Sequence, residues 1–354
     1  MIEQIEIQNF RCFEHLKVPD CKRVNVIVGD NGGGKTALLE AIFLTLGSGT
    51  DIAFRFRQQR GLEGSFAGAP RVIEDAIFGD LFYDRDLKRT VSVGLSGAGP
   101  EARGLRIFRG TGMALEPASN NVVYNPGGVS SASAQSFQFE WTDENRQKHV
   151  ASSQLTQGGL QFGATGEDFP NFFFFPSGQT VGSTETATRF SELSRVRKER
   201  PFIDFFCKEY AWIENLSIEV VGGVPALHAT IRGLSEKIPV TNIGGAINRL
   251  ISVMLAIATQ KQGVVLVDEM ENGVYHEHHT AVWRSILSLT RQYECQLFTT
   301  THNEEWLEAL IEAAGEHVSD LALWRLERVN DRPVLRQFFG KTFKGSIEAG
   351  GEVR

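Results

Sequence analysis

The chain has 354 residues and a mass of 39.2 kDa, with 42% hydrophobic residues, 22% charged residues and a formal net charge of −7. This composition excludes a disordered or fibrous chain, and the longest apolar stretches, Phe172 to Phe175 and Leu250 to Ala258, are too short to cross a bilayer. The negative charge also means that any contact with nucleic acid has to be local.

The N-terminus and the cysteines indicate the compartment. The opening sequence MIEQIEIQNF is acidic and alternating, so it predicts a first strand and no signal peptide. The cysteines lack the paired spacing of a disulfide framework or a structural zinc site; they are Cys12, Cys21, Cys207 and Cys295. We therefore expect a cytoplasmic protein that does not bind a membrane.

The first fifty residues predict a strand, a loop and a helix. Alternation predicts a strand from Ile2 to Gln8, and an apolar run predicts another from Val24 to Val28. A glycine-rich loop then leads into helical spacing from Ala37 to Leu46.

The middle of the chain changes character twice. Residues 51–175 are dense in Gly, Ser and Asn between short alternating runs such as Val91 to Leu95 and Phe137 to Trp141, which predicts an antiparallel β insert. Residues 184–211 have helical spacing with a predicted break at Pro201, and strands are predicted at 217–221 and 226–231. We expect residues 176–239 to form a helical lobe with connecting strands.

The last third alternates helices and strands. The predicted order is a helix at 246–259, a strand at 264–267, a helix at 278–291, a strand at 296–300 and a helix at 304–314. Such alternation is typical of a parallel sheet with crossover helices.

The loop between the second strand and the first helix reads GDNGGGKT, which fits G-x-x-x-x-G-K-[ST]. In this pattern the loop amides surround phosphate oxygens at a helix N-terminus, Lys35 supplies a positive charge, and the Thr36 hydroxyl ligates Mg²⁺. The predicted ATP-binding residues of the loop are Gly29, Asn31, Gly32, Gly33, Gly34, Lys35 and Thr36. A glycine-rich turn without a ligand is the alternative, and the flanking strand and helix favour nucleotide binding.

Acidic residues follow the strand at 264–267. Asp268 and Glu269 end a buried apolar strand, as in a Walker B motif. We expect Asp268 to hold Mg²⁺ and Glu269 to act as the general base for water. His302 follows the next strand, and we expect it to reach the γ-phosphate or to orient the water. The predicted catalytic residues are Lys35, Glu269 and His302.

With these motifs in order, the sequence resembles the ABC-type ATPase heads of the SMC, RecF and OLD group, and most closely the compact AAA15-type bacterial ATPases. Residues 5–13, IEIQNFRCF, resemble the first strand of that group, and residues 268–276, DEMENGVYH, resemble its Walker B and D-loop segment. The tail from 339 to 354 is also similar. The resemblance implies an α/β fold: a P-loop NTPase whose ABC-ATPase-like parallel sheet core comprises residues 1–50 and 240–354, with the antiparallel β insert and the helical lobe.

The resemblance also implies two further elements of the site. TNIGGAINR, residues 241–249, stands where the ABC signature belongs, although the usual serine is missing. There Gly244, Gly245 and Asn248 are the expected nucleotide contacts, and an ordinary glycine-started helix is the alternative. Gln179 stands where the family has a Q-loop glutamine that ligates the metal.

Other clusters have simpler explanations. His276, His278 and His279 do not fit H-E-x-x-H, so a loop entering a helix is favoured over a metal site. The basic run at 195–200 and the arginines at 55, 57 and 60 are more consistent with solvated faces than with nucleic-acid binding, which stays the second interpretation. The four phenylalanines at 172–175 indicate a buried strand.

The resemblance implies an ATPase that works as a homodimer, with ATP and Mg²⁺ held between two copies. It further suggests a role in anti-phage defence or DNA maintenance with an effector protein from a neighbouring gene. The alternative is an ATP-dependent scaffold that restrains or activates a nuclease-like partner with little turnover. A nuclease in its own right is disfavoured, because the nucleases of the OLD group carry an additional TOPRIM domain and the roughly fifty residues after His302 are too few for one. A GTPase is disfavoured because the sequence has no N-K-x-D or T-K-x-D motif to recognise the base.

Overall fold

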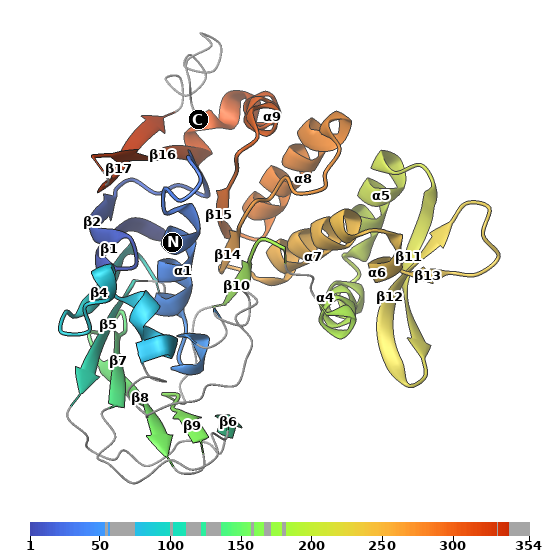
Figure 1. Ribbon diagram of the computed structural model, residues 1–354. Coiled ribbons are helices and arrows are strands. Elements are labelled where there is room, and N and C mark those ends of the chain that lie inside the picture. The colour runs from blue at the N-terminus through green and yellow to red at the C-terminus, as the bar shows by residue number, and fades with distance from the viewer. Residues whose placement is uncertain are drawn as a thin grey trace. The chain divides into compact units, whose positions relative to one another are not determined.

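The computed structural model describes residues 1–53, 56, 75–99, 102–110, 122–124, 136–156, 159–165, 171–178, 182–330 and 332–339. The chain forms two compact units (Figure 1). Unit 1 comprises Met1–Cys21, Gly29–Pro170 and Arg325–Arg336, and unit 2 comprises Lys22–Val28, Asn171–Trp324 and Gln337–Arg354.

Unit 1 is built on an eight-stranded antiparallel sheet of order β2-β1-β4-β5-β7-β8-β9-β6. Its strands are β1 (Ile2–Phe10), β2 (Phe13–Val18), β4 (Val91–Gly97), β5 (Arg103–Gly110), β6 (Val122–Tyr124), β7 (Ser136–Thr142), β8 (Lys148–Thr156) and β9 (Gly159–Phe162). Short 3-10 turns, η1 (Gly79–Leu81) and η2 (Tyr83–Arg85), precede β4. Helix α1 (Lys35–Leu46) is anchored to this sheet, since buried Trp141 on β7 donates through Nε1 to the Leu44 carbonyl at 3.1 Å.

The segments of unit 2 form the parallel part of a second sheet, in which buried strands are neighbours. The six-stranded order is β10-β14-β15-β3-β16-β17, and β10, β14, β15 and β3 run parallel. The strands are β10 (Phe172–Phe175), β14 (Val264–Val267), β15 (Gln296–Thr300), β3 (Val24–Gly29), β16 (Leu321–Val329) and β17 (Arg332–Phe339). Strands β14, β15 and β3 are buried along their whole length; β14 and β3 are apolar apart from Asn25, as expected for such strands, whereas β15 (QLFTT) also buries Gln296, Thr299 and Thr300.

Helices of unit 2 join these strands. They are α7 (Gly245–Thr259), α8 (His279–Gln292) and α9 (Glu304–Ala314), with 3-10 turns η3 (His276–His278) and η4 (Gly315–Asp320). Most of α7 is buried, whereas α8 and α9 bury one face each. No described helix combines the length and the apolar character that a membrane span requires.

The predicted helical lobe contains α4 (Ser183–Arg195), α5 (Glu199–Glu209), α6 (Val240–Ile243) and a three-stranded sheet of β11 (Ile213–Val221), β12 (Val224–Ile231) and β13 (Ile238–Pro239). The predicted break at Pro201 was wrong. The helices part at residues 196–198, and Pro201 is the third residue of α5, where a helix needs no N–H donor.

The compact units do not follow the boundaries expected from the sequence. Strands β1 and β2 pair within the antiparallel sheet, although residues 1–50 were assigned to the core. Strand β10 pairs with β14 in the parallel sheet, although residues 51–175 were assigned to the insert, because its phenylalanines lie beside another fully buried apolar strand. Strands β2, β16 and β17 were not predicted.

Candidate functional site

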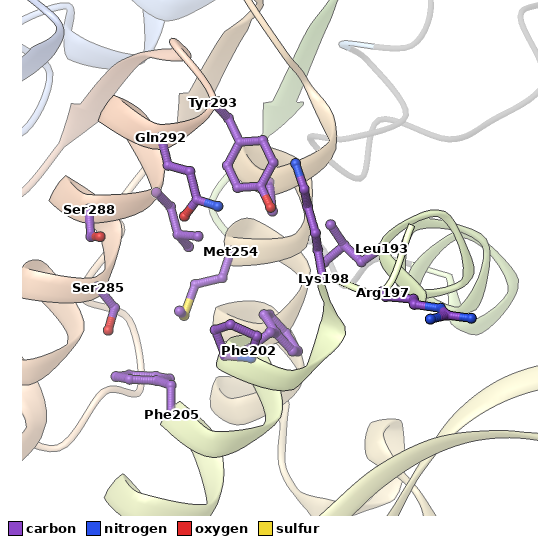
Figure 2. Close-up of a pocket in the computed structure, with 13 residues that line it drawn as sticks. Leu193, Arg197, Lys198, Phe202, Phe205, Met254, Ser285, Ser288, Gln292 and Tyr293 are labelled. Atoms are coloured by element: carbon purple, nitrogen blue, oxygen red, sulfur yellow. The ribbon is translucent and has the colours of Figure 1, made fainter. Parts of the chain in front are cut away.

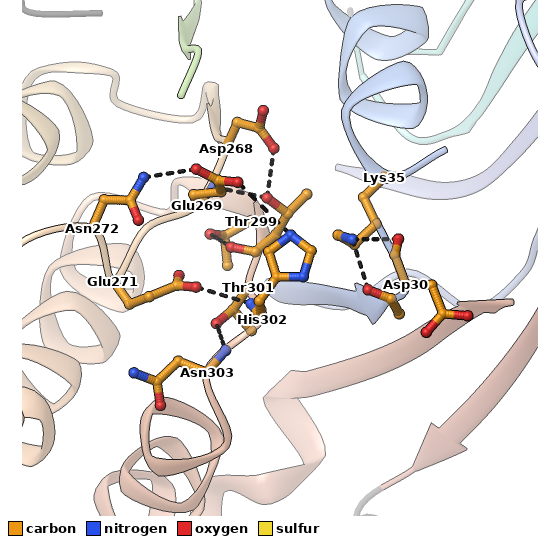
Figure 3. Close-up of polar contacts among 12 residues, drawn as sticks. Asp30, Lys35, Asp268, Glu269, Glu271, Asn272, Thr299, Thr301, His302 and Asn303 are labelled. Atoms are coloured by element: carbon orange, nitrogen blue, oxygen red, sulfur yellow. Dashed lines mark hydrogen bonds and ion pairs between the residues drawn. The ribbon is translucent and has the colours of Figure 1, made fainter. Parts of the chain in front are cut away.

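The phosphate-loop sequence begins at Gly29, the last residue of β3, and ends where α1 begins at Lys35. The Lys35 ammonium donates to the carbonyl oxygens of Gly29 at 2.7 Å and Asp30 at 2.9 Å (Figure 3). The Gly33 amide donates to the Asp30 carbonyl at 3.0 Å, which closes the turn. The loop therefore curls around a largely buried lysine, as a phosphate-binding loop does.

Two glycines of this loop are required by the fold of unit 1. Gly29 has φ 128°, and a Cβ there would lie 2.0 Å from the Leu326 carbonyl oxygen. Gly34 has φ 107°, and its Cβ would lie 2.7 Å from Cζ of Phe13. By contrast Asn31 and Gly32 are exposed. The glycines thus allow close backbone packing behind the loop while its tip stays open.

In unit 2, the ends of β14 and β15 bring acidic and hydroxyl side chains together. Asp268 follows β14 and is 3% exposed, and fully buried Thr300 ends β15. The Thr300 hydroxyl donates to Oδ1 of Asp268 at 2.6 Å and accepts from the Glu269 amide at 2.8 Å. One hydroxyl therefore orients both residues of the predicted Walker B pair.

Glu269 is held in a defined orientation by its neighbours (Figure 3). Its backbone has φ 51°, in the left-handed region that side chains rarely adopt. Asn272 donates through Nδ2 to one carboxylate oxygen at 2.7 Å, and Nε2 of His302 lies 3.7 Å from the other. The structure thus brings Glu269 and His302 together, and strain at Glu269 is typical of a functional residue.

His302 is fixed through its backbone. Its amide donates to Oε1 of Glu271 at 2.9 Å, which ties the end of β15 to the D-loop segment. The next residue, Asn303, caps α9 by accepting from the Trp306 amide at 3.1 Å. The His302 ring therefore projects from a braced turn, with a third of its side chain exposed.

The predicted signature residues lie at the start of α7. Gly244 has φ 158° and precedes Gly245, the first helical residue, and a Cβ at either position would meet nothing within 4 Å. Asn248 differs from them, because its side chain is 2% exposed and its Oδ1 has no hydrogen-bond partner among the described residues. Gly273 of the D-loop segment packs on this turn, and its Cβ would lie 2.4 Å from Cβ of Ala246.

The predicted metal ligands lie in different parts of the chain. Thr36 is in unit 1, Asp268 is in unit 2, and Gln179 lies outside the described residues. The hydroxyl and carboxylate oxygens of Thr36 and Asp268 are donors that Mg²⁺ prefers, so the side chains fit that ion chemically.

The histidine segment after the D-loop has local partners. His278 lies 3.6 Å from Oε2 of Glu209, and buried His279 contacts the Val274 carbonyl at 3.1 Å. Within the described ranges, no group of three or more His, Cys, Asp or Glu side chains is arranged to hold a metal ion.

Sequence reasoning missed three supporting side chains: Thr300, Asn272 and Arg249. Asn272 could have been found within the DEMEN segment, but Thr300 and Arg249 act through contacts that only the fold creates. Burial lowers the pKa of the Arg249 guanidinium, and the carboxylates of Asp268, Glu269 and Glu271 oppose that shift.

Part of the basic run at 195–200 lies beside a cavity that is separate from the predicted ATP site. A cavity of about 230 Å³ lies among α5, α7 and α8 (Figure 2). Phe202 and Met254 form part of its apolar wall, and the exposed Arg197 and Lys198 stand at its edge. No residue of the predicted site lines it. The arginines at 55, 57 and 60 lie outside the described residues.

The family model for the AAA domain matches residues 4–217. The chain belongs to the AAA domain family. The solved structure of an SMC head bound to the C-winged-helix domain of ScpA aligns with this chain at a TM-score of 0.52 and 13% sequence identity. The alignment covers 96% of this chain and 98% of the SMC head chain. This likeness confirms the predicted α/β P-loop fold with a parallel sheet core, antiparallel strands and helices.

Two curated relatives extend the comparison of this AAA-domain protein. An ATP/GTP phosphatase of Helicobacter pylori is 18% identical over 98% of both chains. The DNA replication and repair protein RecF of Idiomarina loihiensis is 48% identical over 12% of this chain and 12% of its own. These similarities agree with the predicted resemblance to ABC-type ATPase heads of the SMC and RecF group.

Proposed function

We propose that the protein binds ATP with Mg²⁺ at the phosphate loop and hydrolyses it with the carboxylates that follow β14. The observation that carries this proposal is the arrangement around Glu269, whose carboxylate is braced between Asn272 and His302 in a strained backbone conformation. A carboxylate held in this way is suited to take a proton from an attacking water.

Other residues of the chain bind the phosphates, bind Mg²⁺ and position the attacking water. The Lys35 ammonium and the loop amides bind the β and γ phosphates. The Thr36 hydroxyl and the Asp268 carboxylate hold Mg²⁺, which supplies charge neutralisation at the phosphates when bound. His302 contacts the γ-phosphate or orients the water from its braced turn.

The second part of the proposal is an ATP-sandwiched homodimer. The start of α7 has bare glycines, no side-chain cap, and open space at Gly244 and Gly245, so its amides can approach an anion. The γ-phosphate bound by one copy would meet this turn of the other copy, as the family resemblance implies. Since each copy supplies half of each site, ATP should promote dimers.

We also propose a protein partner for this chain. The solved SMC head is bound to a domain of another protein, and we propose that this chain likewise works with an effector, in anti-phage defence or DNA maintenance. The β11–β12 hairpin supports a protein partner, because Val220, Val221 and Val224 are 67%, 65% and 52% exposed. A scaffold role with little turnover is the alternative, and it predicts ATP-dependent assembly with slow hydrolysis.

Glu269→Gln tests the proposal because it removes the base and keeps the side-chain shape. We expect ATP affinity within a few-fold of wild type, hydrolysis slowed at least tenfold, and dimers in sedimentation only with ATP and Mg²⁺. Gly245→Glu is the companion variant, since its carboxylate would repel a partner's phosphate and should weaken association while sparing ATP binding. Unchanged turnover in Glu269→Gln would remove Glu269 as the base. A fully active monomer that is indifferent to Gly245→Glu would refute the sandwich.

A further inference from the structure

Arg249 links the predicted signature helix to the ends of two parallel strands. It is the fifth residue of α7 and is 8% exposed. Its guanidinium donates through Nη1 to the Pro176 carbonyl at 2.9 Å and through Nη2 to the Asp268 carbonyl. Pro176 follows the last residue of β10, and Asp268 follows the last residue of β14. One side chain therefore bridges two neighbouring strand ends.

The contacts of Arg249 restrain the peptide group between Asp268 and Glu269. Arg249 holds the oxygen of the Asp268–Glu269 peptide, and the Thr300 hydroxyl holds its N–H at 2.8 Å. Phe175 adds a further restraint, because its carbonyl accepts from the Asp268 amide at 2.8 Å. Rotation of this peptide would change φ of Glu269 and ψ of Asp268 together. Holding both torsions fixed restrains the backbone from which the two carboxylates project.

Packing alone gives no reason for a charge at this position. The residues that follow on α7, from Leu250 to Ala258, are all buried, and all but Ser252 are apolar. A buried guanidinium loses hydration, and a buried ion is a poor source of stability compared with an apolar side chain of similar volume. What Arg249 provides is a fork of donors with fixed geometry, which suits it to hold two carbonyl groups in place.

We propose that Arg249 is a positioning residue for ATP hydrolysis, which acts through the Asp268 carbonyl to orient the Asp268 and Glu269 carboxylates. The inference rests on the proposed roles of those two residues. It makes the geometry of the hydrolytic carboxylates depend on the docking of α7, the helix whose start carries Gly244 and Gly245.

The test compares Arg249→Met with Arg189→Met. Arg189 is a matched control: its side chain is 13% exposed, it donates to Oγ1 of Thr259 on the same helix at 3.0 Å, and it stacks on Phe173 at 4.4 Å. We expect Arg249→Met to lower kcat roughly 10- to 100-fold, with KM for ATP changed less than about threefold, because a small misplacement of reacting groups costs that much. Arg189→Met should lower Tm and leave kcat within about twofold.

Two further variants separate positioning from general support. Arg249→Lys offers one ammonium in place of the fork, so kcat should fall between wild type and Arg249→Met at a Tm near that of wild type. Combining Arg249→Met with Thr300→Val should reduce kcat by much less than the product of the single effects, since both hold the same peptide. If Arg249→Met does not fold, the kcat of Arg249→Lys decides.

The outcomes distinguish this inference from the proposed function. Wild-type kcat in Arg249→Met or Arg249→Lys, or equal losses in Arg249→Met and Arg189→Met, would overturn the positioning role. If those results accompany a slow Glu269→Gln variant, the proposed function stands and only the role of Arg249 fails. If Glu269→Gln turns over ATP normally, the proposed function itself fails.

Discussion

Thr300→Val removes the hydroxyl that joins the two carboxylate residues and keeps the branched shape of the side chain. The wild-type hydroxyl donates to Asp268 at 2.6 Å and accepts from the Glu269 amide at 2.8 Å at a site with no exposure. A hydrogen bond to a charged group contributes about 1.5–3 kcal/mol, and a buried N–H without a partner costs about 1–3 kcal/mol. We therefore expect a loss of about 2.5–6 kcal/mol and a fall in Tm of roughly 5–20 °C.

Catalysis should respond more than substrate binding. Because Thr300 is fully buried and contacts Asp268 and Glu269 only from within the protein, KM for ATP should change little. In contrast, kcat should fall about tenfold or more, because both carboxylates lose their alignment. The assay is phosphate release at saturating ATP and Mg²⁺, measured beside thermal unfolding.

Neighbouring residues supply the controls. Thr299 is also fully buried on β15, but its hydroxyl makes a long 3.3 Å bond to the Thr300 carbonyl, so Thr299→Val should cost less than about 1 kcal/mol and leave kcat near wild type. Thr300→Ser keeps the hydroxyl and should retain most activity. Equal Tm and equal kcat in Thr300→Val and Thr299→Val would refute this account of Asp268 and Glu269.

Further predictions concern the phosphate-loop lysine, two glycines of unit 2 and the buried thiol of Cys295. Lys35→Ala should weaken ATP binding at least tenfold in an equilibrium titration while the protein stays folded, because the ammonium serves the phosphates more than the core; undiminished affinity would contradict the phosphate-loop assignment. Gly273→Ala should destabilise unit 2 by about 2–4 kcal/mol in thermal unfolding, since φ is 79° and the new Cβ would lie 2.4 Å from Cβ of Ala246. Gly222→Ala, with φ 61° and nothing within 4 Å, should cost about 1 kcal/mol, and equal costs would disprove the clash. Burial raises the pKa of Cys295 from 9.0 to about 12, so only the unfolded chain ionises between these values and stability should fall as pH rises from 9 to 12. Cys295→Ala should show a shallower fall in Tm over that range, and an unchanged slope would exclude this thiol as a cause.

The sequence predicted those parts of the site that are contiguous in the chain. The phosphate loop and the Asp268–Glu269 pair each follow an apolar strand, so motif and local structure can be read together. The elements α7, β14, α8, β15 and α9 were predicted for the same reason, with bounds that differ from the structure by at most one residue, whereas β16 and β17 were not predicted.

What could not be predicted depends on contacts between distant segments. Thr300 is one of three consecutive threonines, and nothing in TTT shows which hydroxyl faces Asp268. From the sequence, Arg249 is a charge near the start of an apolar helix, and only the folded sheet brings its carbonyl partners, at positions 176 and 268, close to it. The helix break at residues 196–198 was misplaced because a proline interrupts a helix only beyond its first turn.

The left-handed backbone of Glu269 has a consequence for the evolution of stability in this chain. If stability alone decided, glycine would be preferred at φ 51°, since a side chain there costs about 1–2 kcal/mol. A mutation to glycine would therefore recover part of that energy while removing the proposed base. Selection for a more robust fold and selection for turnover pull in opposite directions at this position. Stabilised variants obtained without an activity screen should accumulate substitutions at Glu269.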